Sequence, residues 1–220
     1  MSSKAERGYD ALAPHYQAIE YLRFGRRLQR ARVGLLDALP RPRTALLLGD
    51  GDGRLLQAFV SRFPEAKVVS VDLSRKMLGL QRRRLGVVPG VRREFVHWVH
   101  GDARQLLFWE SDFDVVVAPF FLDVFLPKDI RQLLQRFSTW LAPDGHLYVV
   151  DFRQPQTGAR YYWAKFWLGM MHLFFRWRTG LEPKQLADLQ EMIQQSDFQL
   201  VAKKTAGHEL IFTAIYRFRR

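Results

Sequence analysis

Short apolar runs alternate with helical patterns through the middle of the chain. Five such runs, most of them rich in valine, lack polar alternation, which is typical of strands buried on both faces of a parallel sheet. They are TALLLG (44–49), AKVVSVD (66–72), REFVHWVH (93–100), FDVVVA (113–118) and HLYVVDF (146–152). The spacing between them predicts helices at 54–63, at 74–85 with Ser74 as N-cap, and at 128–141 after Pro127.

Both ends of the chain depart from this alternation. In residues 8–39 the apolar positions recur at helical spacing, which predicts one or two helices. Pro40 and Pro42 end this segment. A helical pattern at about 183–195 is followed by two strand-like runs, at 197–204 and 209–218. A glycine lies between these two runs, so we expect a closing hairpin.

Repeated strand and helix units predict an α/β fold with a doubly wound, Rossmann-like sheet, whose ligands bind beyond the carboxyl ends of the strands. With 220 residues, no internal repeat and no linker, the chain fits a single domain over 1–220. We divide it into an N-terminal helical segment (1–43), a core (44–152), an aromatic cap (153–182) and a terminal helix with hairpin (183–220).

The cap contains the longest apolar stretch of the chain, within ARYYWAKFWLGMMHLFFRWRTGL (159–181). As a helix, this segment would be apolar around most of its circumference. Three interpretations stay open. It is a buried capping helix, a lid lining an apolar acceptor pocket, or an interfacial helix whose Lys165, Arg176 and Arg178 meet anionic lipid. The stretch is too short to span a bilayer.

The turn GDGDG at 49–53 directly follows the first strand, and a helix begins at once. Such a turn needs positive φ and lets a ligand approach the backbone, because no Cβ is in the way. Asp72 ends the second strand, where a carboxylate can accept hydrogen bonds from both hydroxyls of a ribose. Asp102 follows the third strand, where its carboxylate can accept a hydrogen bond from the exocyclic amine of adenine. Ala103 beside it can donate its backbone N–H to the ring. Each residue alone fits a tight turn or a cap, but together they indicate a nucleoside site.

Nicotinamide dinucleotides compete for this pattern, because their fold shares the glycine turn and the acid at the strand end. Their fingerprint needs a third glycine at the first turn of the helix, where Arg54 stands. Asp50 and Asp52 place two negative charges in the loop, which would repel a pyrophosphate and suit a sulfonium and an ammonium. The loop charge therefore favours a sulfonium cofactor.

The ordered set ALLLGDGDG, VVSVDLSRKML, VHGDARQL, FDVVVAPFFLDVF and LAPDGHLYVVDF resembles the successive motifs of class I S-adenosylmethionine-dependent methyltransferases, in the ubiquinone and menaquinone methyltransferase subgroup. The resemblance covers 44–152, and more loosely YDALAPHY and the hairpin. It implies a seven-stranded, mostly parallel sheet with an antiparallel last strand, and S-adenosylmethionine as cofactor with S-adenosylhomocysteine as product. The residues we expect at the cofactor are Tyr9, Tyr16, Gly49, Asp50, Gly51, Gly53, Asp72, Leu73, Asp102, Ala103, Ala118 and Pro119.

One position departs from the family pattern. The family usually has an acidic residue two positions before the first glycine, and this chain has Leu47. That carboxylate helps to organise the methionine-binding loop, so Leu47 bears on cofactor affinity and activity. Asp50 is the residue we expect to compensate.

The methyl acceptor is marked less clearly than the cofactor. Methyl transfer is an in-line displacement, so positioning supplies much of the rate and a general base is needed only for a poor nucleophile. Candidate bases are His15, Asp123 and His172, for each of which packing or capping is the competing role. The apolar cap favours a hydrophobic small-molecule acceptor, quinone-, aromatic- or lipid-like, methylated on oxygen or carbon.

The formal net charge of +12 is uneven along the chain. Residues 1–43 carry +5, residues 44–151 carry +1 and residues 152–220 carry +6. Basic flanks fit an anionic partner, or simply an arginine-rich solvated surface. An RNA methyltransferase is therefore one alternative, disfavoured because APFF lacks the polar Asn/Asp-Pro-Pro-Tyr type of motif after strand four. A non-catalytic binding protein retaining the fold is another.

The remaining composition narrows the chemistry and the location. The chain has no cysteine, which excludes a disulfide framework and a thiolate metal site. We expect no metal, because His97 and His100, the closest histidine pair, would lie on opposite faces of a strand. The N-terminus has no basic segment followed by an apolar run, so we expect a cytoplasmic protein, with peripheral membrane contact through residues 159–181.

Overall fold

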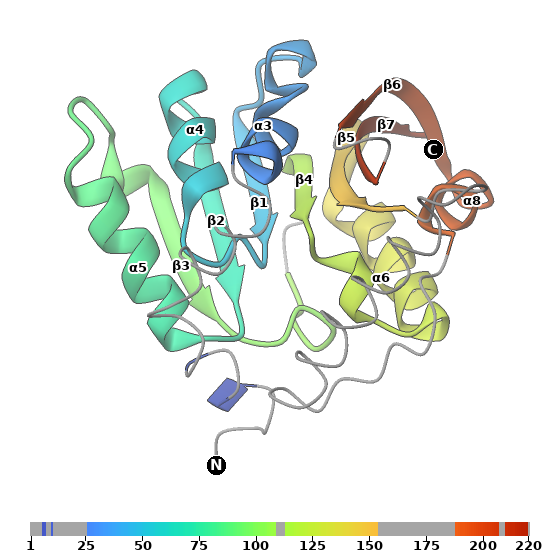
Figure 1. Cartoon of the computed structure of the whole chain (residues 1–220), viewed down its shortest axis with the longest axis horizontal. Helices are drawn as coiled ribbons and strands as arrows, with labels where there is room; N and C mark the ends of the chain where they lie inside the picture. The colour runs from blue at the N-terminus through green and yellow to red at the C-terminus, as the bar shows by residue number, and fades with distance from the viewer. Residues whose placement is uncertain are drawn as a thin grey trace.

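The computed structural model contains one mixed sheet of seven strands (Figure 1). It describes residues 6–7, 10, 26–108, 113–153, 188–206 and 210–219. Across the sheet the order is β3-β2-β1-β4-β5-β7-β6. The strands are β1 (Thr44–Leu48), β2 (Lys67–Asp72), β3 (Val96–His100), β4 (Phe113–Pro119), β5 (Leu141–Phe152), β6 (Phe198–Ala206) and β7 (Ile211–Phe218).

The strand directions confirm the predicted doubly wound sheet. Strands β1 to β5 are parallel to their neighbours, and β7 is antiparallel to both β5 and β6. The chain order reverses between β1 and β4, which is where such sheets open a crevice for ligands. In Figure 1 the arrowheads of β1 and β2 point to the same lower edge, so the segments that follow these strands meet there.

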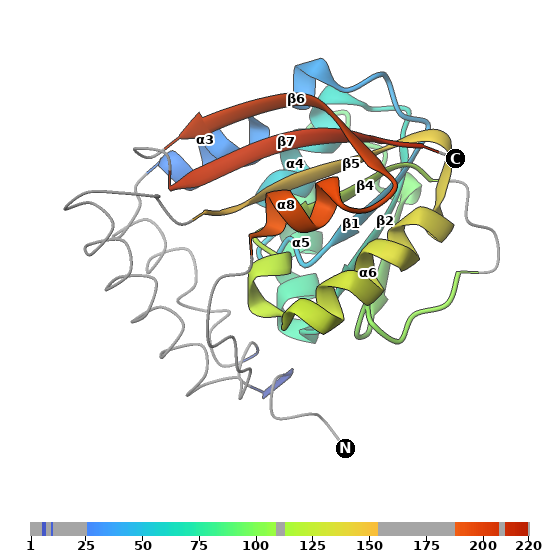
Figure 2. The ribbon, with the colours of Figure 1, turned by 90° about the vertical axis from the view of Figure 1, so that its right-hand side faces the viewer.

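Helices cover both faces of the sheet (Figure 2). One face packs against α3, α4 and the end of α5, through side chains such as Leu28, Phe59 and Leu85. The other packs against α6 and α8, through side chains such as Phe137 and Ile193. The helices are α3 (Arg27–Val33), α4 (Arg54–Arg62), α5 (Arg75–Gly86), α6 (Pro127–Trp140) and α8 (Leu189–Gln194), with short 3-10 turns η1 (Leu36–Ala38), η2 (Arg93–Phe95) and η3 (Leu122–Val124).

The predicted caps of two helices are confirmed. The Ser74 side chain accepts a hydrogen bond from the backbone N–H of Met77 at 3.1 Å, and Pro127 is the first residue of α6. Two strand starts differ from the prediction. The 3-10 turn η2 takes up the first residues expected in β3, and β5 begins early, where Leu141 pairs with Phe113 before a shift in register.

Side chains of the sheet hold α3 in place. The hydroxyl of Tyr148 donates to the carbonyl of Arg32 at 2.8 Å and accepts from the backbone N–H of Leu35 at 3.2 Å. The hydroxyl of Thr213 donates to the carbonyl of Ala31 at 2.8 Å. These bonds satisfy carbonyls that the last turn of a helix leaves without partners, so the end of α3 is fixed against β5 and β7.

The aromatic cap of 153–182, except for Arg153, and most of the N-terminal segment lie outside the described residues. The division of the chain into four segments therefore stays a prediction. No helix among the residues that the structure describes is long and apolar enough to cross a membrane.

Candidate functional site

Gly49, Gly51 and Gly53 all have positive φ, at +64°, +63° and +84°. The first and last of them are also closely packed. A Cβ on Gly49 would lie 2.8 Å from the ring of Phe121, and a Cβ on Gly53 would lie 2.9 Å from the backbone Cα of Gln81. Both the backbone conformation and the close neighbours therefore require glycine at these two positions, as the sequence indicated.

Asp50 caps helix α4. Its carboxylate accepts from the backbone N–H groups of Leu55 at 3.2 Å and Leu56 at 2.7 Å, and burial raises the pKa of Asp50 to about 7. The residue before the helix is Gly53, which has no side chain that could accept a hydrogen bond. The N–H groups of the first turn therefore donate to the carboxylate of Asp50 instead. The carboxylate of Asp50 therefore stabilises the start of α4, and its expected role as a negative charge near a sulfonium stays a prediction.

Asp52 is also paired within the protein. Its carboxylate lies 3.0 Å from Nε of Arg54 and 2.8 Å from Nη2 of Arg84, and Arg84 also donates to its carbonyl. The two arginines neutralise the second charge of the loop. The loop therefore repels a pyrophosphate less than its sequence suggests, because the carboxylates of Asp50 and Asp52 are both paired within the protein.

Asp72 joins the glycine turn to the start of α5. One oxygen of its buried carboxylate accepts from the N–H of Gly51 at 3.2 Å, and the other accepts from the N–H of Ser74 at 2.9 Å. Burial raises the pKa of Asp72 to about 7. Each carboxylate oxygen has a second lone pair, so two acceptor positions remain for hydroxyl donors.

Asp102 is held by Arg104, which donates to both of its oxygens at 2.6 to 3.1 Å. Burial alone would raise the pKa of Asp102, but the hydrogen bonds and charge of Arg104 outweigh it and lower that pKa. The guanidinium of Arg104 also lies 5.4 Å from the ring centroid of Phe125. Ala103 is buried between these groups and the sheet.

The N-terminal segment reaches this edge through residues that the sequence did not single out. The carboxylate of Asp10 accepts from the hydroxyl of Ser74 and, at 3.3 Å, from the N–H of Lys76. Glu6 lies 3.1 Å from Nε2 of His100, which also contacts the carbonyl of Leu73 at 3.0 Å. The predicted site residues Tyr9, His15 and Tyr16 lie outside the described residues, as does His172 in the cap.

The segment after β4 lies against the glycine turn. Ala118 and Pro119 end the strand and are buried, and Phe120 follows with φ of +52°, a conformation that non-glycine residues rarely adopt. The backbone N–H of Phe120 donates to Val150 at 2.6 Å. Phe121 contacts Gly49, so the loop after β4 and the turn after β1 form one continuous edge.

Two buried carboxyl groups meet behind this loop. Asp151, at the end of β5, accepts from the N–H groups of Leu122 and Asp123 at 3.2 Å and from its neighbour Phe152 at 2.8 Å. Asp123 has one oxygen, Oδ1, that is buried without a hydrogen-bond partner. Burial raises the pKa of Asp123 to about 7, and burial together with the charge of Asp123 raises the pKa of Asp151 well above its usual value. The sequence analysis singled out Asp123 but missed Asp151, although Asp151 directly follows the apolar run LYVV of β5.

Arg32 is a further group that sequence reasoning missed. It is buried, its guanidinium lies 5.0 Å from the ring centroid of Phe120, and its charge acts on Asp50. It lies on α3, far from the motifs in sequence. Leu47 is fully buried in the core beneath the turn, where an ionised carboxylate would need a partner of its own.

Among the described residues, no group of three His, Asp or Glu side chains is placed to hold a metal ion. Gly49, Asp72, Asp102 and Asp123 instead follow four neighbouring strands at one edge of the sheet. The arrangement is a glycine cradle with the carboxyl groups of Asp72 and Asp102 on one side and a phenylalanine-rich loop on the other.

Known proteins with similar sequences are methyltransferases. Residues 45–145 match the family described as "Methyltransferase domain". A demethylmenaquinone methyltransferase of Thermus thermophilus is 32% identical over 153 residues, which cover 69% of this chain and 67% of that protein. A trans-aconitate 2-methyltransferase of Acidovorax ebreus is 36% identical over 131 residues, which cover 59% of this chain but only 46% of that protein.

Solved structures share the fold. The 1,6-didemethyltoxoflavin-N1-methyltransferase of Burkholderia thailandensis, which was solved with its substrate and S-adenosylhomocysteine, has a TM-score of 0.67 at 18% identity. The match covers 97% of this chain and 87% of that one. The N-methyltransferase NodS of Bradyrhizobium japonicum has a TM-score of 0.60 at 16% identity, covering 88% of this chain and 97% of that one.

S-adenosylmethionine, the cofactor of these methyltransferases, fits the residues at the sheet edge. The glycine cradle is one that a Cβ would fill, and Asp72 keeps acceptor positions for the hydroxyls of a ribose. The fold, the ordered motifs and the relatives agree. This chain belongs to the class I S-adenosylmethionine-dependent methyltransferases, in the subgroup of the ubiquinone and menaquinone methyltransferases.

Proposed function

We propose that this protein transfers a methyl group from S-adenosylmethionine to oxygen or carbon of a hydrophobic small-molecule acceptor. The observation that carries the proposal is the turn of 49–53, whose positive-φ glycines lie beside the buried carboxylate of Asp72. When bound there, the cofactor supplies a methyl group activated by a sulfonium. The protein's part is to hold both reactants in line and to exclude water.

The proposed cofactor contacts follow the strand ends. Asp72 would accept from the ribose hydroxyls with Leu73 beside it, and Asp102 and Ala103 would face the adenine. The methionine end would lie against Ala118 and Pro119. Gly49, Gly51 and Gly53 would let the cofactor approach the backbone, and Asp50 would act indirectly, by fixing α4 behind the turn.

The proposed acceptor class rests on the rings around the loop after β4. Phe121 and Phe125 lie 5.0 Å apart, and Phe120 and Phe152 also lie 5.0 Å apart. Such a surface favours an aromatic or lipid-like acceptor over a strongly hydrated one. The relative from Thermus thermophilus is named for a quinone precursor, which fits the same class.

Three further expectations belong to the proposal. Of the candidate bases His15, Asp123 and His172, only Asp123 is described, and it is the one we carry forward. The membrane contact expected of residues 159–181 rests on the apolar sequence of that segment. A cytoplasmic location stays an expectation.

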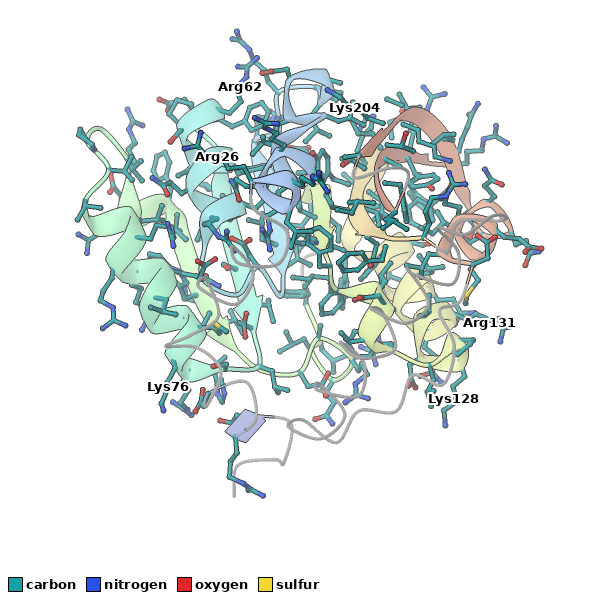
Figure 3. The ribbon with its side chains drawn as sticks, viewed as in Figure 1. Arg26, Arg62, Lys76, Lys128, Arg131 and Lys204 are labelled. Carbon is teal, nitrogen blue, oxygen red and sulfur yellow. The ribbon has the colours of Figure 1, made fainter. Side chains whose placement is uncertain are left out.

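The distribution of positive charge does not favour the RNA alternative. The labelled cations of Figure 3 point outward from separate parts of the molecule and do not form a single stripe along which a phosphate backbone could lie. They are Arg26 before α3, Arg62 on α4, Lys76 on α5, Lys128 and Arg131 on α6, and Lys204 on β6.

Calorimetric titration with S-adenosylhomocysteine tests the proposed cofactor site. We expect the wild type to bind and Asp72→Ala to bind about 100-fold more weakly, because two hydrogen bonds to a charged acceptor are lost. Asp197→Ala, which removes an exposed carboxylate just before β6, is the matched control and should bind as the wild type does. Absence of binding to the wild type would overturn the proposed function.

A further inference from the structure

Asp123 is unusual among the buried polar groups of this protein. Within the described part of the chain, three buried side-chain atoms have no hydrogen-bond partner, and Oδ1 of Asp123 is the one that belongs to a carboxyl group. Leaving such a group without a donor costs about 1 to 3 kcal/mol or more, so native structures rarely keep one without a use. The side chain is 7% exposed, so bulk water does not replace the missing partner.

The neighbouring Asp151 has the opposite environment. Three backbone N–H groups, from Leu122, Asp123 and Phe152, point at its two oxygens. Hydrogen bonds from N–H groups stabilise the ionised form of a carboxyl group, whereas an oxygen without a donor does not. Two adjacent buried carboxyl groups cannot both ionise cheaply. The pair therefore holds at most one negative charge near neutral pH, and the two carboxyl groups share the remaining proton.

The position of the pair connects it to the reaction. Asp123 lies in η3, two residues after Phe121, whose ring contacts Gly49 of the proposed cofactor cradle. Asp151 ends β5, next to β4 in the sheet and on the β4 side of the point where the strand order reverses. Phe121 and Phe125, on either side of Asp123, form the apolar surface on which we place the acceptor.

We propose that Asp123 is the catalytic base for a neutral acceptor with an ionisable hydroxyl group, such as a phenol, an enol or a hydroquinone, and that Asp151 positions it and shares its proton. This inference rests on the proposed function and names the acceptor class within it. Among the described residues, Asp151 is the titratable group beside Asp123, and the charge of Asp123 raises the pKa of Asp151. The cations of α6 that are labelled in Figure 3 point outward.

The proton and electron balance of the step is simple. The ionised Asp123 takes the proton of the acceptor hydroxyl. An electron pair of the acceptor forms the bond to the methyl carbon, and the methyl–sulfur bond breaks with its electrons left on sulfur. Burial raises the pKa of Asp123 to about 7, which is close to the value that best suits a base working at neutral pH.

The same charge discriminates between acceptor classes. A polycarboxylate brought against the pair would add negative charge beside a buried negative charge, in surroundings that screen it poorly. A neutral phenol brings no such repulsion and supplies the hydrogen-bond donor that Oδ1 of Asp123 lacks. The pair therefore selects against acceptors such as trans-aconitate, although a relative named for that substrate is 36% identical over part of its length.

The test compares Asp123→Asn with the wild type, using 1,4-naphthohydroquinone and trans-aconitate as probe acceptors. We expect the wild type to methylate the hydroquinone in preference, with a rate that rises with pH through about 7. Asp123→Asn should lower kcat by about 100-fold or more, the usual contribution of a general base, and should lose this rise with pH. Asp197→Asn, at an exposed site, is the matched control.

Two readouts separate a catalytic role from a structural one. The affinity for S-adenosylhomocysteine should stay within about twofold of the wild type in Asp123→Asn, because Asp123 is not among the residues proposed to contact the cofactor. The melting temperature of the wild type should fall more between pH 4 and 7 than that of Asp123→Asn, because the folded Asp123 keeps a proton that the unfolded chain releases near 3.8. Asp151→Asn should shift the pH–rate profile to a different midpoint.

Preferred methylation of trans-aconitate, or an Asp123→Asn variant with unchanged rate and pH profile, would overturn this inference while leaving the proposed function intact. If Asp123→Asn is unstable, Asp123→Glu keeps the carboxyl group and should retain the pH dependence with a shifted midpoint. A wild type that binds no S-adenosylhomocysteine would instead contradict the proposed function itself.

Discussion

On the proposed cofactor side of the sheet, each carboxyl oxygen of three aspartates accepts at least one hydrogen bond, whereas one carboxyl oxygen on the proposed acceptor side accepts none. Asp50 and Asp72, near β1 and β2, each accept two backbone N–H groups, and Asp102 after β3 is held by an arginine. Asp123, beyond β4, has an oxygen with no donor. All four lie at the same edge, so the difference comes from the local backbone around each group and not from depth in the fold.

We relate this difference to two roles, holding a cofactor in place and accepting a proton. A cofactor that is the same in every turnover is best met by groups already fixed in position, because their hydrogen bonds then need not form during binding. A base must change its protonation state in each cycle, and bonds that fix the ionised form would make it a poor proton acceptor. The following predictions test how firmly the groups of the proposed cofactor side are held in place.

The largest effect on the free energy of unfolding is expected from Gly53→Ala, which disturbs the closely packed glycine turn. The new Cβ would lie 2.9 Å from the backbone of Gln81, at a φ of +84° that alanine rarely adopts. Backbone strain of about 1 to 2 kcal/mol and overpacking of about 1 to 3 kcal/mol should lower the free energy of unfolding by about 2 to 4 kcal/mol. Urea denaturation measures this loss.

Gly79→Ala is the matched control for that substitution. Gly79 lies within α5, and a Cβ there would meet nothing within 4 Å. It should raise the free energy of unfolding by about 0.5 to 1 kcal/mol, because alanine favours the helix. Equal effects of the two substitutions would contradict a rigid, closely packed turn.

A smaller effect is expected from pH on cofactor affinity. Burial raises the pKa of Asp72 to about 7, and only its ionised form accepts hydrogen bonds at both oxygens from ribose hydroxyls. As the pH rises from 6 to 8 the ionised fraction increases, so the affinity for S-adenosylhomocysteine should rise about tenfold. Calorimetry at several pH values measures this change.

Asp72→Asn identifies the group responsible for that pH dependence. The variant should bind more weakly, with an affinity that changes little with pH. Asp50 also has a pKa raised to about 7 by burial. A pH dependence that survives in Asp72→Asn would assign the effect to Asp50 and show that the cap of α4, and not the ribose acceptor, titrates on binding.

The smallest effect on the affinity for S-adenosylhomocysteine is expected from Arg104→Ala. The guanidinium holds Asp102 in place, but the pair is partly exposed, with 40% of the Arg104 side chain accessible. Asp102 should stay ionised at neutral pH without it, so the affinity for S-adenosylhomocysteine should fall only about threefold, as for other exposed ion pairs. Arg92→Ala, which breaks a similarly exposed pair with Glu65 away from this edge, is the control. A loss above about thirtyfold would show that Arg104 itself contacts the cofactor.

The cofactor side could largely be predicted from the sequence, because its signals are local. Glycine at 49 and 53 meets a positive-φ requirement, Ser74 caps α5, and Asp72 ends its strand, and each of these follows from neighbours in the chain. The hydrogen bonds that Asp50 accepts from the backbone of Leu55 and Leu56 were not predicted, for a physical reason. The charge of a side chain is visible in the sequence, but whether it faces a ligand or a helix N-terminus depends on its rotamer and on burial.

By itself the sequence determined the strands, the helices, the caps and the glycine turn, because hydrophobic periodicity and φ preferences act over a few residues. Only the tertiary structure decided which distant groups meet. It brings Asp10 to Ser74, Arg32 to Phe120, and Asp151 to the loop that carries Asp123. These contacts depend on the order of strands in the sheet and on how the helices pack against it, and no local pattern records the environment in which a buried carboxyl group keeps or loses its proton.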